Sequence, residues 1–365
     1  MTMTVIVLGA GATLAQAMTL RSAHTRQHPF LDTSFFQSAL NLANDSEPVA
    51  NQVTRFQTAI EACPQIQSPF AALSERMETF FCDVFYEASS SDSRDALVVF
   101  RELLVLYYRM VGHTTNWVAA HKRLACLDRL LRAELQQGHE IALVSFNQDL
   151  LAENAVNRLP RSEGTWCLRC LYDDPPLTPL QTRRMLFPWQ DNCSHGARVH
   201  LYKLHGSMNW FVRTRDRDPK MSALFPKHKK GAFVLTEGQI RMQSLSMSQS
   251  GSGRTSWSLW PVVLPPVYDK QALTGSDIVN HQWTRARQAL STAARLVLWG
   301  YSIPEADVLS AQMLRRCFAT NDRLMEIHCI NPDPGIVLRV KQITGAKVIH
   351  QYDDIERYLT LGLSL

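Results

Sequence analysis

The sequence predicts an α/β protein, with a Rossmann-type parallel sheet of about six strands and a large helical insertion. Three observations predict this class. Short, nearly continuous apolar runs recur along the chain and end in glycine or small polar residues. Segments with helical spacing separate several of these runs. One segment of more than a hundred residues, 32–138, has helical character and no convincing strand.

The first element is the apolar, β-branched run VIVLG, Val5–Gly9, which predicts a buried strand stopped by glycine. GAGAT follows, and then LAQAMTL, which can be helical. The order of strand, glycine turn and helix is how a doubly wound sheet begins.

The next segment predicts four or five helices. Ala71–Ala88, Arg94–Val111 and Trp117–Gly138 carry apolar residues at helical spacing, and the last stops at glycine, as a helix C-cap would. These helices could cover the sheet, but the length of the segment favours an inserted subdomain at 32–138. The Rossmann domain then comprises 1–31 and 139–365.

Strands return after residue 139. Each is a short apolar run, as expected for strands that are covered on both faces. They are predicted at Glu140–Asn147, Arg198–Ser207, Arg295–Ser302, Met325–Asp333 and Ala346–Tyr352.

Two stretches predict loops. Ser244–Ser258 is rich in serine and glycine, which is typical of a flexible loop. Arg213–Lys230 is rich in lysine and arginine. A solvated loop is the favoured interpretation of the second stretch, with a contact for a partner or nucleic acid as the alternative.

Composition places the chain among ordinary folded proteins, with 45% hydrophobic and 19% charged residues. The net charge of +5 is too small to indicate nucleic-acid binding. The apolar run Val5–Leu8 is too short for a signal-peptide core, and no run of about 18 apolar residues predicts a membrane span. Eight cysteines without such a signal predict reduced thiols in the cytoplasm.

Small polar residues and glycines follow the predicted strands. In an open α/β sheet, ligands bind beyond the carboxyl ends of the strands, so these residues form the candidate site. The candidates are Gly9, Ala10, Gly11, Ala12, Thr13, Ser145, Asn147, Asp149, His205, Gly300, Tyr301, Ser302, Asn331 and Asp333.

Physical roles can be assigned to several of them. Gly9 and Gly11 allow a tight turn and a close approach to a diphosphate, with a helix N-terminus behind. Ser302-Ile303-Pro304-Glu305 has the form of a capping box, so a helix is predicted to begin directly after Gly300. Asn147 and His205 follow neighbouring strands and are predicted to form a polar catalytic pair.

The order GAGAT, SFNQD, KLHGSMNW, VVLPPVYDK, LWGYSIPEAD and INPD resembles the sirtuin-like domain of bacterial NAD-consuming proteins of anti-phage defence. The matches extend from residue 4 to about 335. The resemblance implies an NAD+ hydrolase that releases nicotinamide and ADP-ribose and depletes NAD+ in abortive infection.

By this resemblance the glycine turn, Gly9 to Ala12, contacts the phosphates of NAD, which is the substrate. Asn147 and His205 are catalytic, and Asp149 supports Asn147 or the nicotinamide ribose. Thr13, Ser145, Gly300, Tyr301 and Ser302 belong to the phosphate and ribose site, and Asn331 and Asp333 bind the adenosine end. Thr13 stands where serine is common, and Phe146 replaces the glutamine of the deacetylases.

Two other functions stay open. A protein deacylase would need the two CxxC pairs of a zinc ribbon after His205, and only Cys317 and Cys329 follow it. Cys167, Cys170, Cys193 and His195 could form a zinc site, but free thiols and no metal are expected. A non-catalytic sensor of NAD or ADP-ribose is the other alternative.

The resemblance also implies control by assembly. The expected partners are other copies of the chain, or a HerA-like ATPase or short Argonaute, with nucleic acid involved only indirectly and no membrane.

Overall fold

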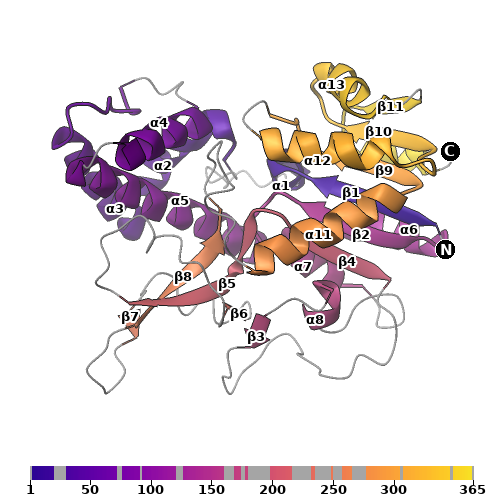
Figure 1. Cartoon of the computed structure of the whole chain (residues 1–365), viewed down its shortest axis with the longest axis horizontal. Helices are drawn as coiled ribbons and strands as arrows, with labels where there is room; N and C mark the ends of the chain where they lie inside the picture. Colours follow the sequence, from indigo (N-terminus) through magenta and orange to yellow (C-terminus); the bar gives the residue numbers. More distant parts are fainter. Residues whose placement is uncertain are drawn as a thin grey trace.

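The protein is described by a computed structural model, shown in Figure 1. The description covers residues 2–19, 30–71, 76–90, 93–120, 126–159, 168–173, 177–179, 198–215, 232–234, 248–249, 257–264, 277–304, 307–345 and 348–363.

A six-stranded parallel sheet forms the centre of the α/β part, which confirms the predicted fold class. Its order is β11-β10-β9-β1-β2-β4. The strands are β1 (Met3–Leu8), β2 (Glu140–Ser145), β4 (Val199–Lys203), β9 (Arg295–Trp299), β10 (Glu326–Ile330) and β11 (Ile349–Tyr352). The run Val5–Leu8 in the central strand is at most 1% exposed, as its continuous apolar sequence predicts.

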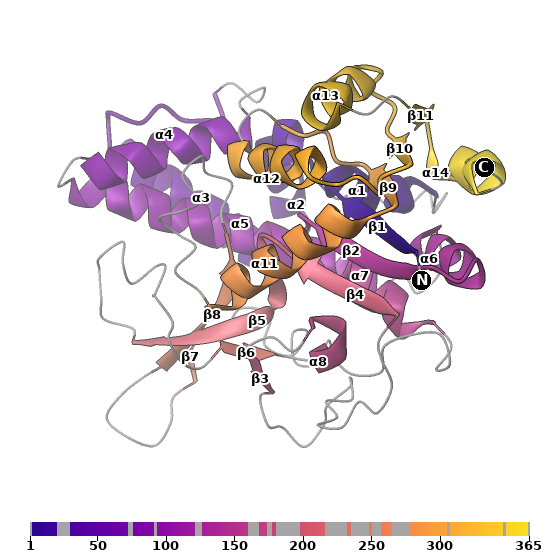
Figure 2. The same cartoon turned by 45° about the vertical axis from the view of Figure 1, so that its right-hand side comes forward.

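Helices cover both faces of this sheet (Figures 1 and 2). On one face, α11 (Asp277–Thr292) packs on β1, β2 and β4, and is followed by α12 (Val308–Ala319) and α13 (Gly335–Thr344). On the other face, α6 (Cys126–Gln136) packs on β2, and α7 (Leu151–Asn157) packs on β4. The chain leaves β1 toward β2 and returns to β9 on its other side, so the topological switch point lies between β1 and β9.

The strand register aligns the carboxyl ends. Leu8 is opposite both Ser145 and Trp299, and Ser145 is opposite Lys203. Residues that directly follow these strands therefore emerge at one edge. The α1 helix (Ala10–Thr19) begins at this edge, and so does the short α14 helix (Ile355–Arg357) after β11.

The described part of segment 32–138 is helical. After a 3-10 turn (Asp32–Ser34) come α2 (Phe35–Ala43), α3 (Glu47–Glu61), α4 (Met77–Ser90) and α5 (Arg94–Ala120). These four pack on one another and lie beside the sheet (Figure 1), whereas α6 packs on β2 and α7. Edge-to-face aromatic contacts, such as Phe36 with Phe80 at 5.3 Å, stabilise this helical core. None of the described helices is long and apolar enough to cross a membrane.

A second sheet, absent from the sequence prediction, extends from the turn after β4. Its order is β3-β6-β5-β8-β7. The strands are β3 (Leu177–Pro179), β5 (Gly206–Arg215), β6 (Ala232–Val234), β7 (Ser248–Gln249) and β8 (Trp257–Val263). The predicted strand Arg198–Ser207 is therefore two strands from two sheets, because Gly206 adopts a φ of 79° and begins β5 in a new direction.

The two predicted loops overlap this second sheet. Within Ser244–Ser258, Ser248–Gln249 form β7 and the last two residues begin β8, while the rest of this predicted loop lies outside the described residues. Arg213–Arg215 lies in β5, and the remainder of the basic stretch, 216–230, is outside the described residues. The short helix α8 (Leu168–Leu171) packs on β4.

Candidate functional site

A cavity of about 950 Å³ opens at the carboxyl edge of the parallel sheet. It lies at the switch point, where doubly wound sheets bind ligands. Most of the residues proposed from the sequence line it: Gly9, Ala10, Gly11, Thr13, Asn147, Asp149, His205, Gly300, Tyr301, Ser302 and Asn331. Residues from four strand ends and the turn after β4 thus meet in one space.

Three proposed binding residues do not line the cavity. Ala12 is fully buried in the first turn of α1. The Ser145 hydroxyl accepts the Asn147 N–H at 3.2 Å and donates to the Asn147 carbonyl at 3.3 Å, so it shapes the turn that carries Asn147. Asp333 accepts the Gly335 N–H at 2.8 Å and forms an ion pair with Arg339 on α13. These contacts stabilise the local structure.

The glycines at the switch point allow two strand ends to touch. Gly9 N–H donates to the Trp299 carbonyl, and Gly11 N–H donates to the Gly300 carbonyl, both at 3.0 Å. A Cβ on Gly9 would lie 2.4 Å from the Gly300 oxygen, and one on Gly300 would lie 2.0 Å from Ala12 N. Backbone packing between β1 and β9 therefore requires glycine here, whatever the ligand.

Asn147 is held by a network of buried hydrogen bonds. Its Nδ2 donates to the Gly9 carbonyl at 2.9 Å and to the Thr13 hydroxyl at 3.0 Å. Thr13 in turn donates to Asp149 Oδ2 at 2.8 Å, and Asp149 Oδ1 accepts the Leu151 N–H at 2.9 Å. Both amide hydrogens of Asn147 are thus used, and the network orients its Oδ1 as an acceptor. Asp149 supports Asn147 through Thr13 rather than directly.

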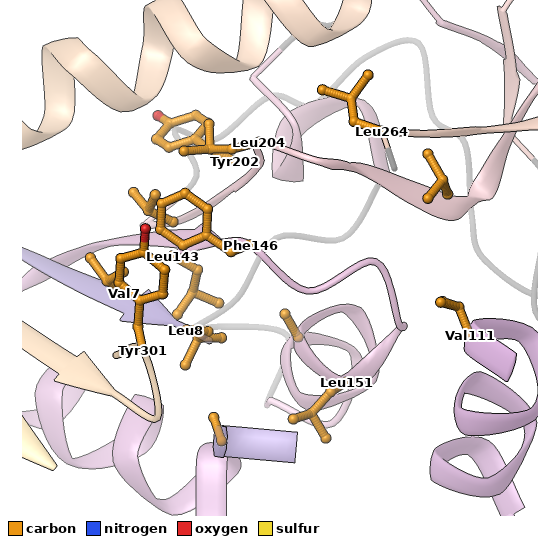
Figure 3. Close-up of a cluster of buried hydrophobic side chains, with 14 of the residues drawn as sticks. Val7, Leu8, Val111, Leu143, Phe146, Leu151, Tyr202, Leu204, Leu264 and Tyr301 are labelled. Atoms are coloured by element: carbon orange, nitrogen blue, oxygen red, sulfur yellow. The ribbon is translucent and has the colours of Figure 1, made fainter. Parts of the chain in front are cut away.

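His205 lies in the turn between β4 and β5, next to a stacked aromatic pair. Its Nε2 is 3.7 Å from Asp307 Oδ2, within ion-pair distance, and its ring is 5.2 Å from that of Phe146. The Phe146 ring stacks on Tyr301 at 4.1 Å (Figure 3), and the Tyr301 hydroxyl donates to Asp307 Oδ2 at 3.0 Å. A carboxylate beside an imidazole is an arrangement suited to general acid–base chemistry.

The Tyr301 hydroxyl stays protonated in this cluster. Burial, followed by the nearby Asp307 carboxylate, raises the pKa of Tyr301 well above its ordinary value. Tyr301 therefore serves as a hydrogen-bond donor to the carboxylate that faces His205.

The other polar residues of KLHGSMNW form a buried layer beneath the cavity. The Lys203 side chain is fully buried, and its Nζ donates to the Asp149 carbonyl and lies 3.5 Å from Glu153 Oε2. Glu153 Oε1 accepts the Ser207 hydroxyl at 3.2 Å and the Tyr172 hydroxyl at 2.8 Å. Asn209 Nδ2 donates to Tyr172 Oη at 3.2 Å. This layer joins β4, β5 and α7 directly below Asp149.

The prediction that a helix begins directly after Gly300 is wrong. Residues Tyr301–Pro304 are not helical, and α12 begins at Val308 with Asp307 as its N-cap residue. Ile303 has a φ of 52°, which breaks any helix starting at Ser302. Tyr301 instead stacks on Phe146, and Asp307 lies beside His205.

Segment 32–138 supplies a wall of the cavity that the sequence did not predict. Asp32, Arg76, Glu78, Tyr107 and Thr114 line it from there. Asp32 joins the start of α4 to the 3-10 turn, since it accepts the Glu78 N–H and the Arg76 Nε–H, both at 2.8 Å. No local motif marks these residues, because helices distant in sequence bring them together.

The cavity has an acidic lining. Arg76 is the one lysine or arginine among the described lining residues, and it is paired with Asp32. Seven carboxylates line the cavity, and the last three of them follow β11. They are Asp32, Glu78, Asp149, Asp307, Asp353, Asp354 and Glu356. Several of these charges are already paired, Glu356 with Arg129 and Asp353 with Arg357.

The described residues hold no group of three or more histidine, cysteine or acidic side chains placed to bind a metal ion. Of the possible zinc ligands, Cys167, Cys193 and His195 lie outside the described residues. Cys170 lies in α8 and is disulfide-bonded, which corrects the expectation of a free thiol there. Cys317 and Cys329 are buried free cysteines.

Fold and site define a Rossmann-type α/β protein with a cavity at the switch point of its sheet. No family model matches the chain, and no curated protein matches it. Among solved structures it is similar to two complexes of Sir2 homologue variants with ADP-ribose, at 13% identity and a TM-score of 0.35, over 100% of this chain and 94% of that chain.

The chain is also similar to a structure described as the basis for the mechanism and regulation of Sir2 enzymes. That match has 12% identity and a TM-score of 0.33, over 67% of this chain and 77% of that chain. Values this low carry no argument about the present site, and the fold is defined by its own strand order and register.

Proposed function

We propose that the protein is an NAD+ glycohydrolase that releases nicotinamide and ADP-ribose. One observation carries the proposal: Asn147 and His205, which are far apart in sequence, line one cavity beside the glycine turn between β1 and β9. An elongated dinucleotide can extend along this edge, with nicotinamide ribose near β2 and β4 and adenosine toward β10 and β11.

The chemistry requires little acid catalysis at the leaving group. Nicotinamide leaves NAD+ as a neutral molecule, because the ring is a cation while it is bonded to ribose. The difficult part is to stabilise an oxocarbenium-like ribose and to place water beneath it. The Asp149 and Asp307 carboxylates lie beside the Asn147 and His205 sites and favour the positive charge that develops on the ribose.

The site residues fit these requirements. Asn147 Oδ1, oriented by the hydrogen bonds from Nδ2 to Gly9 and Thr13, accepts a hydrogen bond from the attacking water. His205, backed by Asp307, accepts a proton from the water or from a ribose hydroxyl.

The test measures free nicotinamide after incubation with NAD+. Asn147→Ala and His205→Ala are each expected to abolish release without loss of folding, as judged by circular dichroism. Asn280→Ala and His281→Ala replace the same residue types on α11, outside the cavity lining, and are expected to retain wild-type release. Full activity of the first two variants would contradict the proposal.

The same experiment separates the two alternatives. A deacylase would release nicotinamide only when an acyl-lysine peptide is added. A sensor would bind NAD+ in calorimetry and return it unchanged. Chromatography of the ribosyl product distinguishes linear from cyclic ADP-ribose.

We further propose that activity is controlled by assembly and that the protein acts in anti-phage defence by depleting NAD+. Uncontrolled hydrolysis would harm the host cell. Segment 32–138 supplies part of the cavity wall. Contacts of this segment with another copy or a partner can therefore change the shape of the cavity. Light scattering and nicotinamide release, measured together over a concentration series with and without the neighbouring gene product, test this proposal. Activity that is high and independent of oligomeric state would contradict it.

A further inference from the structure

We infer that Tyr107, on helix α5, is a positioning residue that holds both members of the proposed catalytic pair through Gln148. The inference rests on the proposed function for its kinetic test and on the hydrogen bonds around Gln148 for its structural basis. By this inference the helical segment 32–138 helps to position the catalytic residues.

Gln148 directly follows Asn147 and is bound at both ends of its side-chain amide. The Tyr107 hydroxyl donates to Gln148 Oε1 at 2.9 Å, and Gln148 Nε2 donates to the Leu264 carbonyl at 3.4 Å. The Gln148 carbonyl also accepts the Met208 N–H at 3.0 Å. Gln148 is thus held between α5, the end of β8 and the start of β5.

The contacts of Gln148 reach His205 as well. Leu264, whose carbonyl accepts from Gln148, donates its own N–H to the His205 carbonyl at 2.9 Å. Gln148 is therefore joined to Asn147 by a peptide bond. Its side chain is joined to the His205 backbone by two hydrogen bonds through Leu264. A shift of Gln148 would move both catalytic side chains relative to each other.

Tyr107 is itself held firmly by the helical segment. It is 3% exposed, and its ring packs at 5.5 Å from Phe81, 6.1 Å from Phe35 and 6.3 Å from Phe30. Tyr107 also lines the cavity. Burial raises the pKa of Tyr107, so the hydroxyl remains a donor. Tyr107 thereby transmits the position of α5 to the loop after β2.

Two partners hold the Gln148 amide in one orientation. A glutamine amide has an acceptor and a donor end of nearly the same shape, and its partners determine which way it points. The Leu264 carbonyl can only accept, so it takes Nε2, and the Tyr107 hydroxyl then donates to Oε1. Without the Tyr107 hydroxyl, the amide loses its 2.9 Å bond and keeps the longer 3.4 Å bond to Leu264, so it is held less firmly.

Tyr107→Phe tests the inference, and Tyr358→Phe is the matched control. Tyr358 is fully buried and donates to Glu134 Oε1 at 3.3 Å, and neither of these two residues lines the cavity. For NAD+ cleavage, Tyr107→Phe is expected to lower kcat about tenfold, with KM changed less than twofold, while Tyr358→Phe retains the wild-type kcat. A Tyr107→Phe enzyme with wild-type kcat would overturn the inference.

A double-mutant cycle separates positioning from general destabilisation. Gln148→Met removes the acceptor, so adding Tyr107→Phe to it is expected to lower kcat no further. If the two substitutions instead multiply each other's effects on kcat, Tyr107 does not act through Gln148, and the inference fails.

Amide hydrogen exchange supplies a readout that does not depend on activity. In the full chain, Tyr107→Phe is expected to speed exchange in peptides that cover 146–150 and 205–209, and Tyr358→Phe is not. If the wild type releases no nicotinamide, the proposed function fails, but this comparison still tests the role of Tyr107. Equal exchange in wild type and Tyr107→Phe would refute that role.

Discussion

The Thr13 hydroxyl donates a 2.8 Å hydrogen bond to Asp149 Oδ2 while it accepts one from Asn147 Nδ2. Thr13 lies in the first helix of the fold, and its two partners lie beyond residue 145. This hydroxyl and the Gly9 carbonyl together fix the direction in which the Asn147 amide points.

Thr13→Val is expected to lower kcat for nicotinamide release by about tenfold to a hundredfold, because it leaves the Asn147 amide and the Asp149 carboxylate without their shared partner. Thr13→Ser keeps the hydroxyl and is expected to stay within about threefold of wild type. Steady-state kinetics on both variants provide the measurement. A valine variant as active as the serine variant would show that Thr13 does not orient Asn147.

Gly300→Ala is expected to destabilise the protein more than Gly345→Ala. Both glycines have a φ near 60°, so an alanine side chain is strained at either position. Only at Gly300 does the new Cβ also meet backbone, 2.0 Å from Ala12 N, whereas nothing lies within 4 Å at Gly345. Urea unfolding is expected to give a loss of about 1 kcal/mol for Gly345→Ala and several times that for Gly300→Ala. Equal losses would mean that the two strand ends can separate freely.

Lys203→Met is expected to lower the free energy of unfolding by about 3–5 kcal/mol, since it leaves the Glu153 carboxylate buried without its cation. The double variant Lys203→Met, Glu153→Gln removes both charges and is expected to recover part of that loss. Denaturant midpoints of the two variants give the comparison. A double variant no more stable than Lys203→Met would indicate that the Lys203 bond to the Asp149 carbonyl is the dominant contribution.

Stability is expected to fall as the pH decreases from about 6.5 to about 4, partly because of His328. Burial, followed by the Arg295 charge, lowers the pKa of His328 to about 4, while the unfolded histidine has a pKa of about 6.5. Between these values the unfolded chain binds a proton that the folded chain does not, so acid favours unfolding.

His328→Gln is expected to reduce this pH dependence, because glutamine does not titrate. Thermal midpoints measured from pH 4 to 7 provide the check, with His281→Gln on α11 as the control. An unchanged slope in His328→Gln would assign the acid sensitivity to other groups.

Much of the fold could be predicted because the six parallel strands are marked by their own composition. Val5–Leu8 is one such apolar run, and its burial follows directly from it. The strand after residue 205 could not be predicted in the same way, because its direction depends on the φ of Gly206 and on a backbone contact with Val262. A local pattern does not encode that contact.

The site divides along similar lines. Asn147 and His205 could be proposed because they follow predicted strands of one parallel sheet, whose carboxyl ends must share an edge. Tyr107 and Asp32 could not, because their place in the cavity depends on how distant helices pack. The Ser302–Glu305 pattern was misleading, since the backbone at Ile303 diverts the chain before a helix can begin.

The central position of β1 has a consequence for biosynthesis. Its two partners, β2 and β9, begin at Glu140 and Arg295. β1 leaves the ribosome first, and it can pair with β9 only after about 290 more residues have been synthesised. At ordinary translation rates that delay is roughly 15–60 s, during which an apolar strand has an open edge. Nascent chains stalled before Arg295 are therefore expected to need a chaperone, whereas chains released after Trp299 can close the middle of the sheet.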